Sequence, residues 1–505
     1  MSNQPVIIPR SQHPISRNWI SSNAVRVLYR LKESGYRAYL VGGGVRDLLL
    51  GREPKDFDIA TDAKPNEIKK IFRNCRLIGR RFRLAHIHFH NEIIEVATFR
   101  SNITELPEAP PESAPLQETA MVEPAASAEP APPQPDAPPA EGANGSASAG
   151  TETAAPKPKP PQLLKSEDGM ILRDNVFGTP EQDALRRDFT VNALFYNIAD
   201  FSVIDYVGGM EDLRKGLIRT IGDPVVRFIE DPVRMVRAVR FAAMLGFEME
   251  DETYRAMLEL RDKVALASNA RMYEEVQKLF LLGEGEKVFQ LLRKTGLFGV
   301  LFPHLNAWLD TEDGDFPHIR TGKALEWVDA CVQAGRKVEP QVFMSLAFGQ
   351  YIEEKWARLK AGGKIPLEAL DEAVAEFLGE IVPRVQVPRK VALAVRDILW
   401  NQSRFEKQQG KQPLYFLRRP GFMDAFEYLR FTSEVTGERM ELRMWWKDFL
   451  RQHALVPHAK PGVTVLEDRH APVAGPRKQH DAKQKDRRRR RRPRRRGPKP
   501  TAPQP

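Results

Sequence analysis

A glycine turn and two closely spaced carboxylates occur together in the stretch Tyr39-Leu-Val-Gly-Gly-Gly-Val-Arg-Asp-Leu-Leu-Leu-Gly-Arg-Glu-Pro-Lys-Asp-Phe-Asp-Ile-Ala60. The carboxylates, Asp56 and Asp58, are two residues apart in a run that predicts a strand, so both side chains point to one face. Upstream, the glycines allow backbone N–H groups to approach a phosphate closely, and Arg46 adds a planar set of donors. Paired carboxylates can hold two Mg²⁺ ions roughly 3.5–4 Å apart on the attacking and leaving oxygens of a phosphoryl transfer. The stretch therefore predicts metal-dependent nucleotidyl transfer.

An Asp-x-Asp pair by itself is more often a turn or a solvated strand end, but here it follows Gly-Gly and Arg-Asp. The whole stretch resembles the nucleotidyltransferase head of the DNA polymerase beta superfamily, in class II of the tRNA nucleotidyltransferase/poly(A) polymerase family. The resemblance covers residues 24–294, apart from an insertion. It implies that Gly42, Gly43 and Arg46 bind the triphosphate of ATP. It also implies that Asp56 and Asp58 are catalytic and are ligands of a two-metal Mg²⁺ site.

Size and composition are those of a soluble protein with several domains. The chain has 505 residues, of which 42% are hydrophobic and 29% charged, and this length predicts two to four domains. The two cysteines, Cys75 and Cys331, have no metal-ligand spacing, which favours free thiols in a reducing compartment. We find no apolar run of about 18 residues and no apolar signal segment near the start. We therefore expect a cytoplasmic protein without a membrane partner.

Two segments are expected to be disordered. Residues 105–162 contain nine acidic residues and two lysines in a Pro-, Ala- and Ser-rich sequence, which cannot bury enough apolar surface to fold. We interpret this as an acidic insertion, over residues 103–165, within the catalytic domain. At the other end, residues 460–505 contain 16 Lys and Arg against four Asp and Glu. The formal net charge of +10 therefore belongs to this tail, and the rest of the chain is near neutral.

The periodicity of the remaining sequence predicts an α+β head followed by all-α neck, body and RNA-binding regions. Helical spacing covers residues 20–34, 63–72, 231–245, 251–263, 270–282 and 285–294, with a short helix over 45–50. Strands are expected at 39–41, 57–60, 84–89, 92–99 and 203–207. The expected domains are a flexible N-terminus (1–20), the head (21–224), a neck with a base-reading site (225–295), a body with RNA-binding regions (296–455) and a disordered basic tail (456–505).

Glu95 lies in the apolar run Ile93-Ile-Glu-Val-Ala-Thr-Phe-Arg100. A carboxylate in such a strand is costly unless it is paired or bound to a metal. From the residues alone, an exposed edge of a strand is an equally good interpretation. The family resemblance implies a third catalytic carboxylate on a strand beside Asp56 and Asp58, and Glu95 matches that position.

A second motif is Arg186-Arg187-Asp188-Phe-Thr-Val-Asn192-Ala. A bare Arg-Arg-Asp would favour a structural ion pair between two elements. The full motif resembles the family's, which implies that Arg187, Asp188 and Asn192 belong to the nucleotide site, with Arg187 on phosphate or ordering the head and Asp188 accepting from a ribose hydroxyl.

A third motif, Glu230-Asp-Pro-Val-Arg234, begins a run with further arginines at 237 and 240. Steps of three keep the arginines on one slowly drifting helix face, while the intervening residues are apolar. The ordinary interpretation is a solvated charged stripe. The resemblance implies instead that Asp231 and Arg234 read the base, and that Arg237 and Arg240 bind the triphosphate.

Three histidines at 86, 88 and 90 alternate along one expected strand. A zinc site is disfavoured, because this spacing is a poor tetrahedral ligand set without a further partner. The run Arg80-Arg-Phe-Arg83 before them is interpreted as a basic surface near phosphate.

Three features favour a template-independent poly(A) polymerase over the other members of the family. The runs Gly79–His86 and Asp174–Asp188 resemble the bacterial poly(A) polymerase version, and the basic tail suits sequence-independent attraction to RNA phosphates. The expected partners are ATP and RNA 3′ ends (mRNA, small RNA and possibly tRNA), with RNA-decay proteins as further candidates. The alternatives are a CCA-adding or A-adding tRNA enzyme, and a non-catalytic RNA-binding protein.

Overall fold

The computed structural model describes residues 4–79, 83–101, 164–165, 171–173, 176–311 and 319–453. The predicted acidic insertion, apart from residues 164–165, lies outside the described residues, as do the basic tail and residues 80–82 of the basic run. All described residues belong to one compact unit, Met1–Pro457. The domain boundaries expected within it stay predictions.

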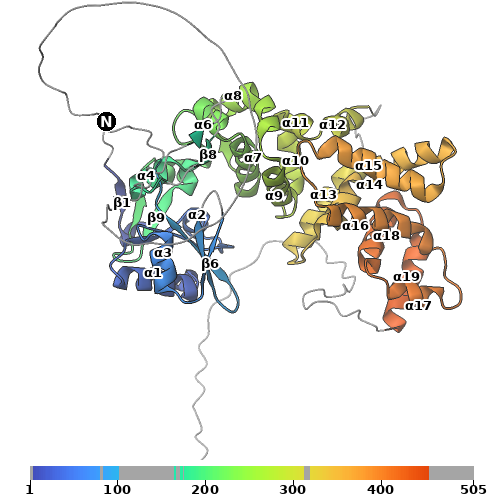
Figure 1. Cartoon of the computed structure of the whole chain (residues 1–505), viewed down its shortest axis with the longest axis horizontal. Coiled ribbons are helices and arrows are strands. Elements are labelled where there is room, and N and C mark those ends of the chain that lie inside the picture. Colours follow the sequence, from blue (N-terminus) through green and yellow to red (C-terminus); the bar gives the residue numbers. More distant parts are fainter. Residues whose placement is uncertain are drawn as a thin grey trace, which may run out of the picture. The chain divides into compact units, whose positions relative to one another are not determined.

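The N-terminal half contains an eight-stranded mixed sheet (Figure 1) with the strand order β1-β10-β9-β2-β3-β6-β5-β4. Neighbouring strands are antiparallel except β3 and β6, which are parallel. The strands are β1 (Val6–Ile8), β2 (Ala38–Val41), β3 (Asp58–Thr61), β4 (Cys75–Ile78), β5 (Leu84–His88), β6 (Ile93–Thr98), β9 (Leu194–Asn197) and β10 (Val203–Asp205). Two small two-stranded sheets pair β7 (Leu164–Lys165) with β8 (Ile171–Arg173), and β11 (Leu217–Ile218) with β12 (Glu248–Met249).

Short helices connect these strands. They are α1 (Ser22–Glu33), α2 (Gly43–Leu49), α3 (Pro65–Ile71), α4 (Pro180–Leu185) and α5 (Gly209–Lys215). In α1 the buried residues recur at the predicted helical spacing, from Ala24 to Leu31, and the Ser21 side chain accepts from the N–H of Asn23 at the N-terminus. A Ser cap of this kind satisfies one of the unpaired N–H groups of the first turn.

The prediction of a flexible N-terminus over residues 1–20 is wrong for the part that the structure describes. Residues 6–8 form β1 and pair with β10, while Ile15 and Ile20 are buried. The His13 ring contacts the carbonyl oxygen of Phe201 at 2.8 Å. The segment lacks periodicity because only Ile8 of its single short edge strand is buried. Similarly, α2 begins at Gly43 rather than at residue 45.

From residue 224 onward the described chain is almost wholly helical, as predicted. The helices are α6 (Pro224–Glu230), α7 (Val233–Leu245), α8 (Asp251–Leu260), α9 (Asn269–Phe280), α10 (Gly285–Lys294), α11 (Leu297–Leu301), α12 (Pro303–Leu309), α13 (Ile319–Gln333), α14 (Pro340–Ala361), α15 (Pro366–Ile381), α16 (Arg389–Trp400), α17 (Gln412–Leu417), α18 (Phe422–Thr436) and α19 (Met440–Gln452). The predicted α+β class with a helical second half is confirmed.

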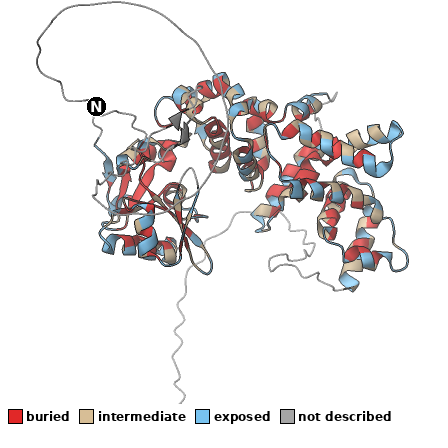
Figure 2. Ribbon diagram, viewed as in Figure 1, coloured by how far each residue is buried: buried red, intermediate tan, exposed pale blue. Residues whose placement is uncertain are grey.

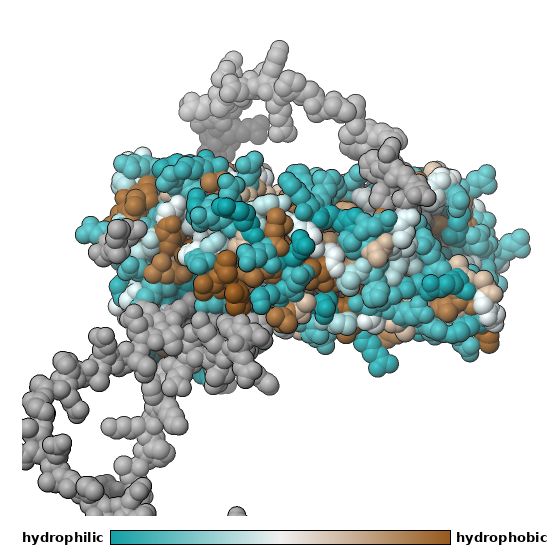
Figure 3. Space-filling view, turned by 90° about the horizontal axis from the view of Figure 1, so that it is seen from above, coloured by the Kyte–Doolittle hydropathy of each residue, from teal (hydrophilic) through white to brown (hydrophobic). Residues whose placement is uncertain are grey.

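Buried residues follow the strands and the packed faces of the helices (Figure 2). A separate aromatic cluster joins α17, α18 and α19 around Phe405 and Trp446. On the face drawn in Figure 3, hydrophilic residues divide the exposed hydrophobic ones into small patches. Among the described residues, no helix combines the length and the apolar character needed to cross a bilayer.

Candidate active site

The glycine turn and the carboxylate strand approach each other at the end of β2. Val41 of β2 is opposite Asp58 of β3. Gly42 has a φ of 74°, a backbone conformation that glycine adopts without a steric penalty. A Cβ on Gly44 would lie 3.2 Å from the carbonyl oxygen of Asp56, tighter than nine in ten Cβ contacts in proteins. Both glycines therefore permit α2 to begin directly above the carboxylates.

This end of the sheet opens into a cleft of about 750 Å³. The cleft contains Asp56, Asp58 and all the residues predicted to bind the nucleotide: Gly42, Gly43, Arg46, Arg187, Asp188, Asn192, Asp231, Arg234, Arg237 and Arg240. They come from segments nearly 200 residues apart in the sequence, and the fold brings them together. Their individual roles stay predictions.

The Asp58 carboxyl has an unusually high pKa of about 6. Desolvation by the surrounding protein is the largest cause, and the charges of Glu95 and Asp56 raise the pKa further, while Arg187 lowers it. The residue is nevertheless accessible from the cleft. Closely spaced carboxylates that destabilise each other's charge are suited to a divalent cation, whose charge relieves the repulsion.

Glu95 lies beside Asp58 but does not line the cleft. The two residues are in register on the parallel strands β3 and β6. On its other side Glu95 is in register with His86 of β5, and the His86 Nε2 to Glu95 Oε1 distance is 3.3 Å. Among the described residues, no three His, Cys, Asp or Glu side chains are already grouped closely enough to hold a metal. The metal role of Glu95 therefore stays a prediction.

The arginines near the glycine turn are held by neighbouring polar groups. Arg46 is buried and donates to the Oδ1 of Asn192 at 2.7 Å and to the carboxylate of Asp47 at 2.7 Å. Arg187 pairs with Asp183 at 3.0 Å. Because these contacts use some of the five donors of a guanidinium, they orient the group and leave other donors for a ligand.

A chain of alternating charges crosses the cleft from the head to α9. Arg237 donates to the Asp188 carboxylate at 2.5 and 2.8 Å, and it also pairs with Glu275 at 3.5 Å. Arg240 and Lys278 pair with the same glutamate at 3.4 and 3.1 Å. Burial alone would raise the pKa of Asp188, but the charge and hydrogen bonds of Arg237 hold it well below its usual range. Asp188 is therefore ionised at neutral pH.

Two arginines that no sequence motif indicated, Arg227 and Arg271, hold the groups at the predicted base-reading site. Arg271 of α9 donates to both oxygens of Asp231, at 2.9 and 2.8 Å. Arg227 of α6 donates to Glu230 at 2.8 Å and to the carbonyl oxygens of residues 186 and 187 at 2.6 Å each. Arg234 donates to the carbonyl oxygen of Arg227 at 2.8 Å and pairs with Glu230 at 3.5 Å.

Further charged residues line the cleft and were not among the predicted site residues: Asp47, Lys55, Arg100, Asp183, Arg186, Arg271 and Lys278. One sequence pattern could have indicated the residues of α9. Arg271, Glu275 and Lys278 recur at i, i+4 and i+7 and form a charged stripe along the helix. Such a stripe is usually solvated, so it does not by itself indicate a site. Only the packing of α9 beside α7 shows that it faces the cleft.

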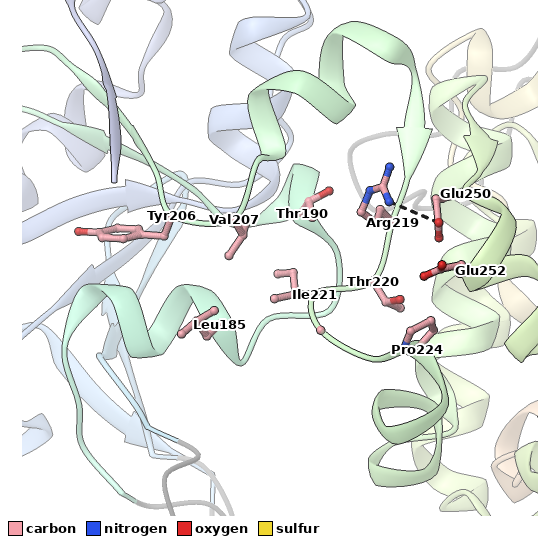
Figure 4. A pocket seen from close by; sticks show the side chains of 11 residues that line it. Leu185, Thr190, Tyr206, Val207, Arg219, Thr220, Ile221, Pro224, Glu250 and Glu252 are labelled. Atoms are coloured by element: carbon pink, nitrogen blue, oxygen red, sulfur yellow. Dashed lines mark ion pairs between the residues drawn. The ribbon is translucent and has the colours of Figure 1, made fainter. Parts of the chain in front are cut away.

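A second hollow of about 320 Å³ lies between the head and the first helices of the neck (Figure 4). Its lining combines apolar side chains, such as Leu185 and Ile221, with Arg219 and Glu250, which form an ion pair at 3.3 Å. Arg219 also pairs with Asp212 at 3.1 Å. None of the residues predicted to be functional lines this second hollow.

Comparison with known proteins identifies the chain. Residues 38–219 match the poly A polymerase head domain, 246–309 match the "probable RNA and SrmB-binding site of polymerase A", and 362–496 match the polymerase A arginine-rich C-terminus. The chain is 39% identical to Poly(A) polymerase I of Salmonella typhimurium, over 92% of this chain and 90% of the relative. The chain belongs to the bacterial poly(A) polymerase family. It is a nucleotidyltransferase of the poly(A) polymerase type, as the motifs predicted.

The CCA-adding enzymes are more distant from this poly(A) polymerase. The CCA-adding enzyme of Lactobacillus gasseri is 33% identical over 54% of each chain. A solved structure of a CCA-adding enzyme from Bacillus stearothermophilus, in complex with CTP, has a TM-score of 0.51 at 24% identity and covers 88% of this chain and 84% of that one. This likeness shows a shared fold.

Proposed function

We propose that this poly(A) polymerase transfers AMP from ATP to RNA 3′ ends in the cleft between the sheet and α7, with Asp56 and Asp58 as ligands of two Mg²⁺ ions. The observation that carries the proposal is the position of Asp58. Its carboxylate opens into the same cleft as the glycine turn and the arginines of α7. An anionic pair facing a cationic wall suits a triphosphate that must be bound on one side and attacked on the other.

The carboxylates present fit Mg²⁺. This ion is usually held by one or two carboxylates, with substrate phosphates and water completing its octahedron, so a preformed cluster of three protein ligands is not required. The raised pKa of Asp58 means that its charged form is unfavourable in these surroundings, and a nearby cation would stabilise that form. Bound Mg²⁺ would lower the pKa of the RNA 3′-hydroxyl and neutralise the charge of the departing pyrophosphate. Glu95, in register with Asp58, is proposed as the third carboxylate.

The cationic wall is proposed to orient the triphosphate. Gly42 and Gly43 at the start of α2 offer backbone N–H groups, and Arg46, Arg187 and Arg240 offer guanidinium donors. Since Asp188 is ionised and paired with Arg237, it can accept a hydrogen bond from a ribose hydroxyl. Asn192 supports the site by holding Arg46.

Asp231 and Arg234 are proposed to select adenine. A carboxylate can accept from the exocyclic amine of adenine, and a guanidinium can donate to a ring nitrogen. Their orientation is set by Arg271 and Glu230 respectively. A base with the wrong donor pattern would leave these groups unpaired, at a cost of about 1–3 kcal/mol for each buried group.

We infer mRNA and small-RNA 3′ ends as the substrates and the cytoplasm as the location, with RNA-decay proteins as partners. The test is incubation with an unstructured oligo(A) and, separately, a tRNA lacking CCA, each with ATP or CTP in Mg²⁺. Long A tracts on both RNAs support the proposal. Addition that stops after C-C-A would assign a CCA-adding activity, and no incorporation would indicate a non-catalytic protein.

A further inference from the structure

The short helix α17 and the loop before it form an unusually basic segment. Residues 401–420 contain five Lys and Arg and a single acidic residue, Glu406. Glu406 is paired with Arg439 at 2.8 Å, so it does not neutralise its own segment. Net positive charge therefore stays on this surface, which lies outside the catalytic cleft.

One face of α17 presents an aromatic ring between cations. Lys411 and Arg418 directly precede and follow α17, both with helical backbone angles, so their spacing of i, i+4 and i+7 with Tyr415 places the three on one face. Arg419 follows Arg418. Tyr415 is 64% exposed, the highest value among the exposed large hydrophobic side chains. Within the described part of the chain, no carboxylate pairs with these three cations, and the side chain of Tyr415 has no hydrogen bond or ring contact, although its backbone N–H donates to the carbonyl oxygen of Lys411 at 3.1 Å.

The opposite face of α17 is firmly packed. Phe416 and Leu417 are buried, and the Phe416 ring centroid lies 4.9 Å from that of Phe405 and 5.7 Å from that of Trp446. The exposed ring of Tyr415 is thus carried by a helix anchored in an aromatic core. The fold does not need this ring for packing, since hydrophobic contacts on the other face already hold the helix.

We propose that this face, Lys411, Tyr415, Arg418 and Arg419, is a binding platform for single-stranded RNA. A base stacks on Tyr415, and the neighbouring phosphates contact the cations on either side. Lys411 and Arg418 are about 10 Å apart along the helix axis, so the charges flank the ring. Exposed aromatic rings with unpaired cations are the usual means of binding single strands without sequence preference. The inference rests on the proposed RNA substrate and adds a second contact that retains the product between additions.

Stacking is tested by RNA affinity of the full-length protein, measured by fluorescence anisotropy with a labelled single-stranded oligo(A). Tyr415→Ala should weaken binding about tenfold, the size of a lost base–aromatic stack, and Tyr415→Phe should restore it to within about twofold. Met444→Ala on α19, which removes another exposed apolar side chain (46% exposed), is the matched control and should bind normally. Unchanged affinity in Tyr415→Ala, or a Phe variant as weak as the Ala variant, would overturn the platform.

The cations are tested by the dependence of affinity on salt. If Arg418 and Arg419 each contact a phosphate, replacing both by Gln should lower the slope of log K against log salt by about 1.4, at about 0.7 for each contact to a single strand. Arg389 and Lys390, exposed at the start of α16, provide the matched double Gln control, which should keep the wild-type slope. Equal slopes in the two double variants would contradict the proposal.

Two further measurements, of AMP incorporation and of poly-glutamate binding, distinguish this proposal from its alternatives. AMP incorporation at saturating RNA should be unchanged in all these variants, because none of the residues lines the cleft. The RNA-binding platform can therefore be disproved without contradicting the proposed catalytic function. Binding of poly-glutamate should be insensitive to Tyr415→Ala. A loss of poly-glutamate binding without a loss of RNA binding would assign the face to an acidic protein and overturn the RNA proposal.

Discussion

Arg227 joins the head to the proposed base-reading motif, and its replacement should lower both the stability and the catalytic rate. Its guanidinium is buried and donates to the carbonyl oxygens of Arg186 and Arg187 on one side and to Glu230 on the other. Desolvation lowers the pKa of Arg227 to about 10, so it is still charged at neutral pH. In Arg227→Ala, Glu230 loses its donor at 2.8 Å, and two carbonyl oxygens lose theirs.

The magnitude follows from these contacts. Removing one partner of a buried ion pair costs about 3–5 kcal/mol, a large part of the 5–15 kcal/mol typical of a domain. Arg227→Lys keeps the charge but can satisfy fewer of the three acceptors, so we expect a loss of about 2 kcal/mol, the scale of one charge-assisted hydrogen bond. Since misplacement by about 1 Å can cost 10²-fold in rate, kcat of Arg227→Lys should fall roughly 10²-fold.

The assay combines denaturant unfolding with kcat and KM for ATP on oligo(A). Arg219 is the matched control, because it also pairs with two carboxylates, Asp212 and Glu250, but lies at the second hollow and is 40% exposed. Arg219→Lys should lose at most about 1 kcal/mol and keep wild-type kcat. If Arg227→Lys is folded and has wild-type kcat and ATP:CTP preference, Arg227 does not position the two motifs.

Four further outcomes are expected. Asp56→Ala and Asp58→Ala should each abolish incorporation while RNA binding persists, and turnover within about tenfold of wild type in either would rule out the two-metal site. Arg234→Ala should slow addition and relax the ATP:CTP preference, and an unchanged ratio would show that it does not read the base. Deleting residues 460–505 should weaken RNA binding and flatten its salt dependence without lowering incorporation at saturating RNA, and loss of that activity would contradict this. Because the pKa of Asp188 is depressed on folding, its stabilisation is complete above the unfolded value of about 3.9 and is lost as pH falls below it. Acid unfolding of Asp188→Asn should therefore have a shallower pH dependence, and equal slopes would contradict the Arg237 pairing.

The head could be predicted because its candidate site residues belong to short sequence motifs with fixed spacing. Asp56 and Asp58 both line the cleft, as their close spacing indicated, although only Asp58 lies in β3 and Asp56 precedes the strand. The helix over residues 285–294 was predicted to the residue, since its boundaries coincide with a change of periodicity. In contrast, β1 could not be predicted, because an edge strand of three residues with one buried side chain carries no usable pattern.

The residues that hold the candidate site residues in place could not be predicted from the sequence. Arg227 and Arg271 lie 40 or more residues from the groups they hold, Arg187 and Asp231 respectively. Nothing local distinguishes an arginine that orients a catalytic motif from one on a solvated helix face. The difference is created by tertiary packing, which brings α6 against the carbonyl oxygens of the head and α9 against the end of α6.

These supporting contacts explain how so many arginines can lie close together in one cleft. Like charges crowded together would repel one another, yet Arg46, Arg187, Arg237 and Arg271 each have a carboxylate at 3.0 Å or less. One or two hydrogen bonds to an acid leave a guanidinium with donors to spare, so the acids fix the direction of each arginine without exhausting it. A nucleotide bound as proposed would meet donors that are already oriented, so little reorganisation would be required at the moment of reaction. Lysine, with a single compact charge on a flexible stem, could not be held by an acid and still present a second set of fixed donors.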